Sequence, residues 1–440
     1  MRTFVAIVAG LLTLSACLSA QEPAKQSLPS APLPPARGSS SPSASSSVTL
    51  DEALRLALEH NHALLALRST ILQSQAQEIT ANLRPNPVLA WDAQFLPIFQ
   101  PDQFSADYID NNAQFDAGVS YLFERGKKRQ HRLQAARDAT AVVRSQVSDS
   151  ERQLVFNVAQ QFINVLLAES TLSFAEQDLD SFQKTVDISE TRFHAGDMSE
   201  GDLLKIRLQL LQFQSDVSAA KLARVQALAG LRQFLGFASV ADDYDVSGDL
   251  DYQPLRSTLP DLKTMASQSR PDLAAAVQGV TAAHSQLALA EANGKQDLTA
   301  AVSYSHTAGA SSATFAFNIP LAVFDRNQGE IARTRYAITQ AQEQLSETSQ
   351  QVSTDVTDAY ENLRTNDRII QLYRGGYVDQ AKRSRDISEY AYRRGAASLL
   401  DYLDAERTYR ANQLAYRQAL AGYMVAVEQL REAVGTRNLP

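Results

Sequence analysis

The chain has 440 residues, 44% of them hydrophobic and 20% charged, so it is long enough for a large core and is not disordered as a whole. Its formal net charge of −8 argues against a nucleic-acid partner. The only cysteine, Cys17, cannot form a disulfide within the chain, and beyond the first twenty residues no apolar run is long enough for a transmembrane helix. We therefore expect any insertion into a membrane to use β-strands or an attached lipid.

Residues 1–17 are typical of an export signal, with a positive residue before a short apolar core. The run Leu14-Ser15-Ala16-Cys17 comes directly after that core and resembles the lipobox of bacterial lipoproteins, in which the cysteine is acylated. The alternative is an ordinary signal that is cleaved near Ala20, so that Cys17 is discarded. We favour a lipoprotein, because the only cysteine occupies the position that acylation requires.

A tether and a helix are predicted next. Residues 18–48 are rich in proline, serine and alanine, which is typical of an extended segment without a core. Thr49-x-x-Glu52 is a capping box, and the helix that it begins is expected to run to about Asn82.

Four segments alternate between apolar and polar residues with a period of two, which predicts strands at about 88–96, 113–123, 298–306 and 313–322. The apolar positions are Leu89, Trp91, Ala93 and Phe95; Phe115, Ala117, Val119, Tyr121 and Phe123; Leu298, Ala300, Val302 and Tyr304; and Phe315, Phe317, Ile319 and Leu321. Strands of this kind suit a transmembrane β-barrel, with the apolar side toward lipid and the polar side toward a lumen. The alternative is a soluble four-stranded sheet packed on helices.

Each pair of strands is followed by a helical hairpin, predicted at 126–235 and 328–435. In the first hairpin apolar residues recur at intervals of seven from Val158 to Phe193, which indicates a coiled-coil seam. In the second they recur from Val356 to Tyr377, within a helix expected to continue to about Arg393.

The tips of the two hairpins carry the same three residue types. Gly196, Ser199 and Asp202 each have a counterpart 199 residues later, in Gly395, Ser398 and Asp401. The glycine suits the left-handed position after a helix, the serine is a good N-cap, and the aspartate belongs in a first turn.

The order helix, two strands, long helix, tip, helix therefore occurs twice. We predict a tandem duplication, with a first repeat at 49–236, an irregular equatorial segment at 237–260 and a second repeat at 261–440. Four strands cannot close a barrel, since about eight is the practical minimum, and lipid does not tolerate open sheet edges. Several copies must therefore share one barrel.

The duplicated layout, together with Tyr392-Arg393-Arg394-Gly395-x-x-Ser398-x-x-Asp401-x-Leu403-Asp404-Ala405, resembles the TolC-type outer-membrane efflux protein family over about residues 49–436. Leu321-Ala322-Val323-Phe324-Asp325-Arg326-Asn327-Gln328-Gly329 is similar to the branch of cobalt–zinc–cadmium and related efflux channels. The resemblance implies a mainly α fold with a contribution to a transmembrane β-barrel. It implies a homotrimer with a twelve-stranded barrel in the outer membrane and an α-helical tunnel in the periplasm.

The resemblance also implies a function and partners. The trimer would be a passive exit duct for small toxic solutes, drugs or metal cations. It would sit in outer-membrane lipid, with Cys17 as the lipid anchor, and work with a periplasmic membrane-fusion adaptor and an inner-membrane pump of the RND type. An exit duct for type I protein secretion has the same fold and stays open as an alternative. A structural lipoprotein that spans the periplasm without a channel is a third candidate, but it has no need of strands with an aromatic apolar side.

The resemblance also implies that three carboxylates are aperture residues. Asp401 and Asp404 match the family's carboxylates at the closed end of the tunnel, and Asp202 matches the corresponding position in the first half. In a trimer each would form a ring that repels anions and attracts cations. The alternatives are a plain capping role for Asp401 and an ordinary surface position for Asp404.

The turns at Gly196, Ser199, Gly395 and Ser398 are the adaptor-docking tips that the resemblance implies; turn geometry alone would also explain these residues.

Six histidines are present, but no cysteine or carboxylate cluster completes a metal site around them. No nucleotide, phosphate-loop or catalytic motif is found. We predict no metal site, no cofactor and no enzymatic activity.

Overall fold

The computed structural model describes residues 47–439. The predicted signal, the acylation of Cys17 and the tether as far as residue 46 lie outside the described residues.

The first helix is broken at Asn61, so the prediction of one helix as far as Asn82 is wrong. The break separates α2 (Leu50–His60) from α3 (His62–Asn82). The Asn61 backbone is extended, its side-chain oxygen accepts a hydrogen bond from the Leu64 amide at 3.1 Å, and its side-chain nitrogen donates to the Phe234 carbonyl at 3.1 Å. One buried asparagine thus ends one helix, caps the next and ties both to α6 (Glu200–Leu235).

The second half has a matching break at Arg270, between α7 (Leu259–Ser269) and α8 (Pro271–Asn293). Pro271 disfavours a helical backbone at the residue before it, which explains the position of the break. The buried Arg270 side chain donates to the Ala433 carbonyl of α11 (Leu399–Val434) at 3.1 Å and to Asp355 at 2.9 Å. Both breaks are therefore held by a hydrogen bond to the last helix of their own half.

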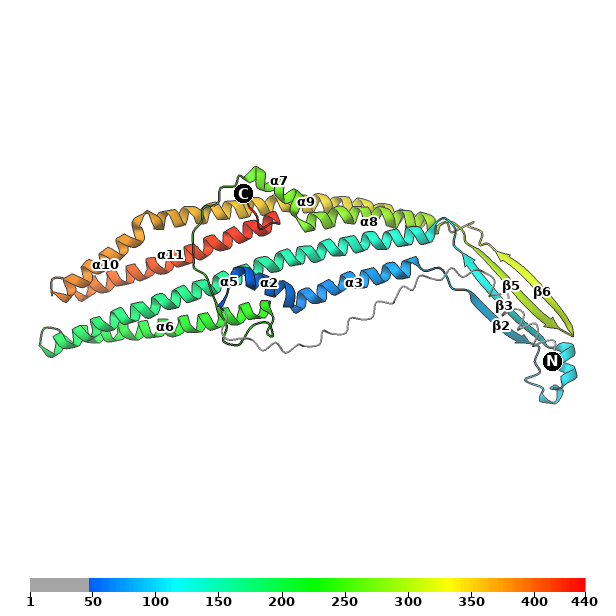
Figure 1. Ribbon diagram of the computed structural model, residues 1–440, viewed down its shortest axis with the longest axis horizontal. Helices are drawn as coiled ribbons and strands as arrows, with labels where there is room; N and C mark the ends of the chain where they lie inside the picture. The colour runs from blue at the N-terminus through cyan, green and yellow to red at the C-terminus, as the bar shows by residue number, and fades with distance from the viewer. Residues whose placement is uncertain (1–46, 440) are drawn as a thin grey trace. The chain divides into compact units, whose positions relative to one another are not determined.

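The long helix of the first hairpin, α5 (Lys128–His194), has 67 residues and is continuous. Because it begins just after a strand and ends at a tip, it separates the two by about 100 Å at ~1.5 Å per residue. It contacts α3, α6, α8 and α11. Figure 1 shows the hairpin of α5 and α6 lying alongside that of α10 (Val378–Arg393) and α11.

The long helix of the second hairpin is not continuous, which corrects the prediction of one helix from Gln328 to Arg393. A five-residue π-helical segment, Tyr373–Tyr377, separates α9 (Gln328–Leu372) from α10. Within it Gly376 has a φ of 106°, a conformation that glycine adopts at little cost. The extra residue in this turn moves Tyr377 off the predicted seam, and its side chain is 57% exposed.

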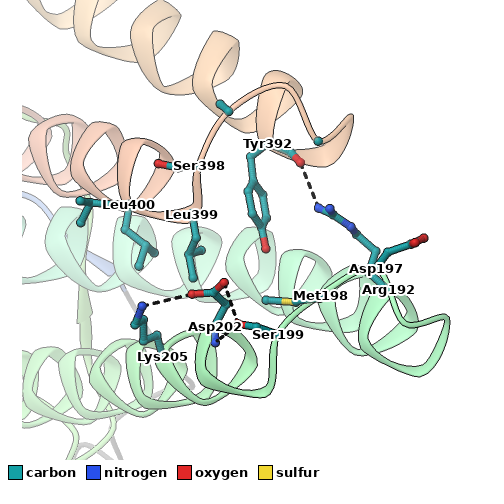
Figure 2. A pocket seen from close by; sticks show the side chains of 13 residues that line it. Arg192, Asp197, Met198, Ser199, Asp202, Lys205, Tyr392, Ser398, Leu399 and Leu400 are labelled. Carbon is teal, nitrogen blue, oxygen red and sulfur yellow. Dashed lines mark hydrogen bonds and ion pairs between the residues drawn. The ribbon is translucent and has the colours of Figure 1, made fainter.

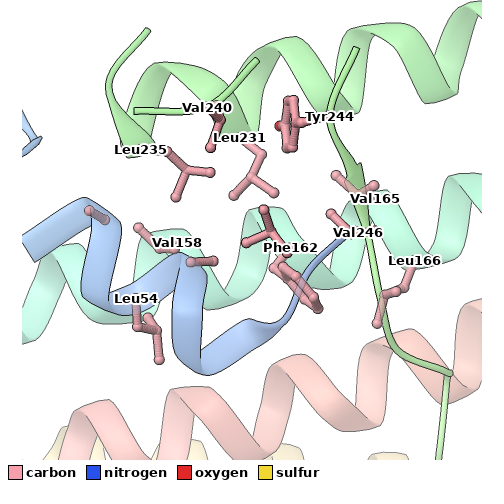
Figure 3. Close-up of a cluster of buried hydrophobic side chains, with 13 residues drawn as sticks. Leu54, Val158, Phe162, Val165, Leu166, Leu231, Leu235, Val240, Tyr244 and Val246 are labelled. Atoms are coloured by element: carbon pink, nitrogen blue, oxygen red, sulfur yellow. The ribbon is translucent and has the colours of Figure 1, made fainter. Parts of the chain in front are cut away.

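Two of the hydrophobic clusters between the helices are similar in size. The first joins α2, α5 and α6, and the seam residues Val158 and Val165 are fully buried in it (Figure 3). It also contains Val246 of β4 (Asp245–Val246), which pairs in parallel with β1 (Ser47–Val48). The equatorial segment, predicted to be irregular, therefore contributes a short strand to this core. The second core joins α7, α9 and α11 around Leu262, Val356 and Leu430.

The four predicted strands form one antiparallel sheet in the order β2 (Val88–Gln94), β3 (Gln114–Phe123), β5 (Leu298–Thr307), β6 (Ala310–Asn318). The pairing places Leu89 opposite Val119, Val119 opposite Val302, and Val302 opposite Phe315. A row that points to the other side of the sheet joins Asp92, Asp116, Ser305 and Ser312. All the predicted apolar positions within the strands thus share one side of the sheet, because strand residues alternate with a period of two.

Two strands end earlier than predicted. β6 ends at Asn318, four residues before the expected end, because Pro320 has no amide to donate to a ladder. β2 ends at Gln94, and Phe95 takes a left-handed backbone with a φ of 56°. The segment between β2 and β3 contains a 3₁₀ turn (Pro101–Gln103) and a short helix, α4 (Ala106–Asn112).

We predict that Asn61→Ala destabilises the protein by about 1–2 kcal/mol, because it removes a helix cap and leaves the Phe234 carbonyl unpaired. Thermal unfolding of the purified protein should show a lower Tm. Ser69→Ala is the matched control on α3: the Ser69 hydroxyl is exposed and bonds only to the Leu65 carbonyl of its own helix. An equal loss in both variants would contradict the bridging role of Asn61.

Candidate functional site at the hairpin tips

Both tips turn through a left-handed glycine. Gly196 has a φ of 83° and Gly395 a φ of 75°. At the first tip the Asp197 amide bonds to the Arg192 carbonyl at 2.9 Å, and at the second the Ala396 amide bonds to the Ala391 carbonyl at 2.8 Å. These are the bonds of a Schellman C-cap, for which any residue with a β-carbon would be strained.

Each tip continues into a serine-capped helix. Ser199 accepts from the Asp202 amide at 3.1 Å, and its hydroxyl donates to the Asp202 carboxylate at 2.9 Å. Lys205 adds a bond to the same carboxylate at 3.1 Å. The hydrogen bond from Ser199, followed by that from Lys205, holds the pKa of Asp202 below its usual range.

The second tip has a complete capping box. Ser398 accepts from the Asp401 amide at 3.2 Å, while the Asp401 carboxylate accepts from the Ser398 amide at 3.2 Å. The capping interpretation of Asp401 is confirmed, and its aperture role stays a prediction. Asp404 lies one turn further along α11, is exposed, and makes no side-chain hydrogen bond or ion pair with residues 47–439.

A pocket of about 440 Å³ opens between the two tips (Figure 2). Of the predicted site residues, four line it: Ser199, Asp202, Gly395 and Ser398. Gly196, Asp401 and Asp404 do not line this pocket. Arg192 crosses from one hairpin to the other, donating to the Tyr392 carbonyl at 3.0 Å with its guanidinium 5.4 Å from the Tyr392 ring centre.

An aromatic stack behind the pocket holds the two hairpins together. Phe213 of α6 stacks on Phe182 of α5 with ring centres 4.4 Å apart. Phe182 lies parallel to Tyr402 of α11 at 6.5 Å, and Tyr402 is stacked on Tyr392 of α10 at 5.4 Å. The two tyrosine hydroxyls approach Thr185 and Ser189 at 3.4 and 3.3 Å.

Deeper between the hairpins lies a buried charge cluster that the sequence analysis missed. Asp178 of α5 and Glu406 of α11 are 6% and 4% exposed. The Arg410 guanidinium is 2.6 Å from the Asp178 carboxylate, an ion pair without the angle of a hydrogen bond, and it also bonds to Asp216 of α6. Arg385 of α10 lies 3.9 Å from Glu406. The cluster therefore joins all four helices of the two hairpins.

Burial raises the pKa of Glu406 to about 8, and the neighbouring Asp178 charge adds to the increase. Burial also raises the pKa of Asp178, which the positive charge of Arg410 opposes. A signal for these residues was present in the sequence, because Asp178 lies in the same helical stripe as Phe182, and Glu406 in the same stripe as Tyr402. Charges in an apolar stripe usually mark a buried pair.

No set of three or more histidine, cysteine or acidic residues is placed to hold a metal ion in the described part of the chain. Within the same residues, the search for a helix long and apolar enough to cross a membrane finds none.

Comparison with known proteins identifies the family. The sequence model of the outer membrane efflux protein family matches residues 53–237 and 262–436. The chain belongs to this family. It is 22% identical to the cobalt-zinc-cadmium resistance protein CzcC of Cupriavidus metallidurans over 88% of this chain and 90% of that protein. It is 23% identical to the outer membrane protein TolC of Escherichia coli K12, over 78% and 76% of the two chains.

Solved structures agree on the fold. The open state of the MtrE outer membrane channel of Neisseria gonorrhoeae superposes with a TM-score of 0.71 at 17% identity, covering 88% of this chain and 89% of that one. The resemblance found from the sequence is thereby confirmed. The protein is thus a helix-rich efflux channel protein of the outer membrane.

We predict that Glu406→Gln makes the protein more stable at alkaline pH. A carboxyl whose pKa is raised on folding stabilises the fold while protonated, and this contribution is lost as the pH rises through about 8. Glutamine cannot ionise, so the free energy of unfolding, followed by thermal unfolding, should fall less between about pH 5 and about pH 9, with a difference on the order of 1–3 kcal/mol at the alkaline end. Asp404→Asn, on an exposed position of the same helix, is the control and should leave the profile unchanged. Parallel profiles for Glu406→Gln and wild type would refute the buried-acid assignment.

Proposed function

We propose that three copies of this protein assemble into the exit duct of a tripartite efflux system. The observation that carries the proposal is the one-sided sheet with two available edges. In the described chain β2 and β6 each pair with a single neighbouring strand. Since lipid offers no hydrogen-bond partners to a sheet edge, β6 of one copy must pair with β2 of the next, which closes twelve strands in a trimer.

The surface of the sheet supports insertion into lipid. On the apolar side Trp91 is 70% exposed and Phe315 is 72% exposed, although both are large apolar groups. The other side carries Asp92, Asp116 and a row of serines and threonines. With seven to ten residues, the strands approach the length needed to cross the hydrocarbon core at the usual tilt. In the closed assembly the apolar side would face lipid and the polar side a water-filled lumen.

The helices supply the rest of the proposed duct. The two halves have the same order of elements, which supports a tandem duplication that gives each copy two similar hairpins. Three copies would place six hairpins around one axis and continue the lumen as an α-helical tunnel. The tips would then carry the adaptor-docking turns at Gly196, Ser199, Gly395 and Ser398, and an inner-membrane pump of the RND type would supply the energy. Acylation of Cys17 would anchor each copy in the outer membrane.

Asp401 and Asp404 are proposed to form the aperture of the tunnel, with Asp202 contributing from the first hairpin. Threefold symmetry would turn each exposed carboxylate into a ring of like charge, which attracts cations and excludes anions. Asp404 suits this role because it is exposed and has no partner among residues 47–439. The engagement of Asp401 in the capping box does not prevent it from facing a lumen.

The proposed cargo is small toxic solutes, either drugs or metal cations. CzcC is by its name a cobalt-zinc-cadmium resistance protein, and this similarity favours cations.

Deletion of the gene should sensitise cells to drugs or to metal salts, because the pump would have no exit. Minimal inhibitory concentrations should fall for at least one compound class and return when the gene is restored on a plasmid. If tolerance is unchanged and a secreted protein is lost, the function is type I protein secretion and not efflux. Unchanged tolerance and secretion would favour a structural role in the periplasm.

We expect Asp401→Asn combined with Asp404→Asn to change single-channel conductance in planar bilayers and to reduce cation selectivity, because both charge rings would be neutral. Asparagine keeps an oxygen for the Ser398 amide, so the capping box survives the change. Glu200→Gln, at the exposed start of α6, is the control for a tip carboxylate outside the aperture. Identical conductance and selectivity in the double variant and the control would exclude the aperture role.

A further inference from the structure

Basic residues gather where the sheet meets the helices. Each of the four connections between a strand and a helix at this end carries at least one of them: Arg84, Arg125 with Lys127, Lys295, and Arg326. Arg129 follows in the first turn of α5. We call these residues the basic collar. The chain as a whole has a net charge of −8, so the collar stands out against an acidic background.

The rest of the sheet contains no lysine or arginine. None occurs from Val88 to Phe123 or from Leu298 to Phe324. The segment between β2 and β3, at the other end of these strands, carries Asp102, Asp107 and Asp110 instead. Lysine and arginine are thus confined to the helix end of the sheet, and the charged residues of the segment between β2 and β3 at the other end are all acidic.

The acidic residues near the collar are already engaged. Asp297 pairs with Lys128 at 2.7 Å, and Glu124 pairs with Arg132 at 2.7 Å. Asp325 accepts a hydrogen bond from the Asn327 amide at 2.8 Å. The side chains of Arg84, Arg125, Lys127, Arg129 and Lys295 make no hydrogen bond or ion pair with residues 47–439. The collar therefore has cationic groups to spare for a ligand.

Two hollows lie among these residues. One, of about 630 Å³, is lined by Lys295 and Arg326 and by the apolar side chains of Leu321 and Phe324. The other, of about 250 Å³, is lined by Arg84 and Arg129. Leu321 is 84% exposed and Phe324 90% exposed, so bare apolar surface lies directly beside the cations.

We propose that the basic collar binds the anionic headgroups of phospholipids in the leaflet on the helix side of the membrane. The inference rests on the proposed insertion of the sheet into lipid. A glycerophospholipid has the two features that the site matches: a phosphate for the guanidinium and ammonium groups, and acyl chains for Leu321, Phe324 and the apolar side of the sheet. The free amides at the start of α5 and α9, whose N-caps make no side-chain bond, would add to the attraction for the phosphate.

The chain contains its own probe for this proposal, because its one tryptophan is Trp91, on the apolar side of β2. The full-length protein would be reconstituted into phosphatidylcholine bilayers with a brominated lipid, which quenches tryptophan on contact. Brominated phosphatidylcholine reports whether the sheet lies in lipid. Brominated phosphatidylglycerol, mixed with unlabelled phosphatidylcholine, reports the preference for an anionic headgroup.

We expect phosphatidylglycerol to be favoured about threefold or more over phosphatidylcholine, and the preference to weaken as salt is raised. The triple variant Arg84→Gln, Arg129→Gln and Lys295→Gln should bring the ratio close to one. The matched control, Lys382→Gln, Arg383→Gln and Arg407→Gln, removes the same charge from exposed positions on α10 and α11 and should keep the wild-type preference.

Equal quenching by the two lipids in the wild type would contradict the proposed headgroup binding by the collar. An undiminished preference in the triple variant would contradict it as well. Neither result would contradict the proposed insertion of the sheet into lipid. A preference lost equally in the control would overturn it too, since net charge alone would then be responsible. If neither lipid quenches the tryptophan, both the headgroup binding by the collar and the proposed membrane insertion are wrong.

Discussion

The two unsatisfied edges of the sheet are the constraint on which the rest of this protein depends. Backbone amides and carbonyls on β2 and β6 need partners, and the aromatic side of the sheet needs an apolar surrounding. Neither need can be met by the chain's own helices, since they continue away from the sheet for the length of α5. The proposed assembly and the proposed insertion into the membrane would therefore have the same physical cause.

At the other end of the helices the packing is of a different kind. The hairpins meet through stacked rings and, behind them, through buried carboxylates and guanidiniums. Ion pairing offsets the free-energy cost of burying these charges. The offset is incomplete for Glu406, whose pKa is raised by burial. The contact between hairpins thus combines a pH-insensitive aromatic layer with a pH-sensitive ionic layer, and the two can be altered separately by mutation.

Local patterns in the sequence predicted the strands and the tips, because period-two alternation and glycine–serine–aspartate spacing are decided by neighbouring residues. They also placed the apolar positions correctly, although strand pairing is a long-range property, since a slip of one residue would move Leu89 to the other side of the sheet from Val119 and Val302. Asn61 was missed because its effect depends on the Phe234 carbonyl, 173 residues away. The position of Asp178 in an apolar stripe indicates burial, but its partner Arg410 lies 232 residues away on another helix, so the pair was missed for the same reason.

The glycine pair at Gly375 and Gly376 makes the two hairpins mechanically unequal. α5 transmits a displacement along its whole length as one rod, whereas α10 is joined to α9 through a left-handed glycine. With sixteen residues, α10 is a lever of about 24 Å, so a bend of about 10° at Gly376 displaces its tip by about 4 Å. The second hairpin is therefore the compliant one, and the first serves as its fixed support.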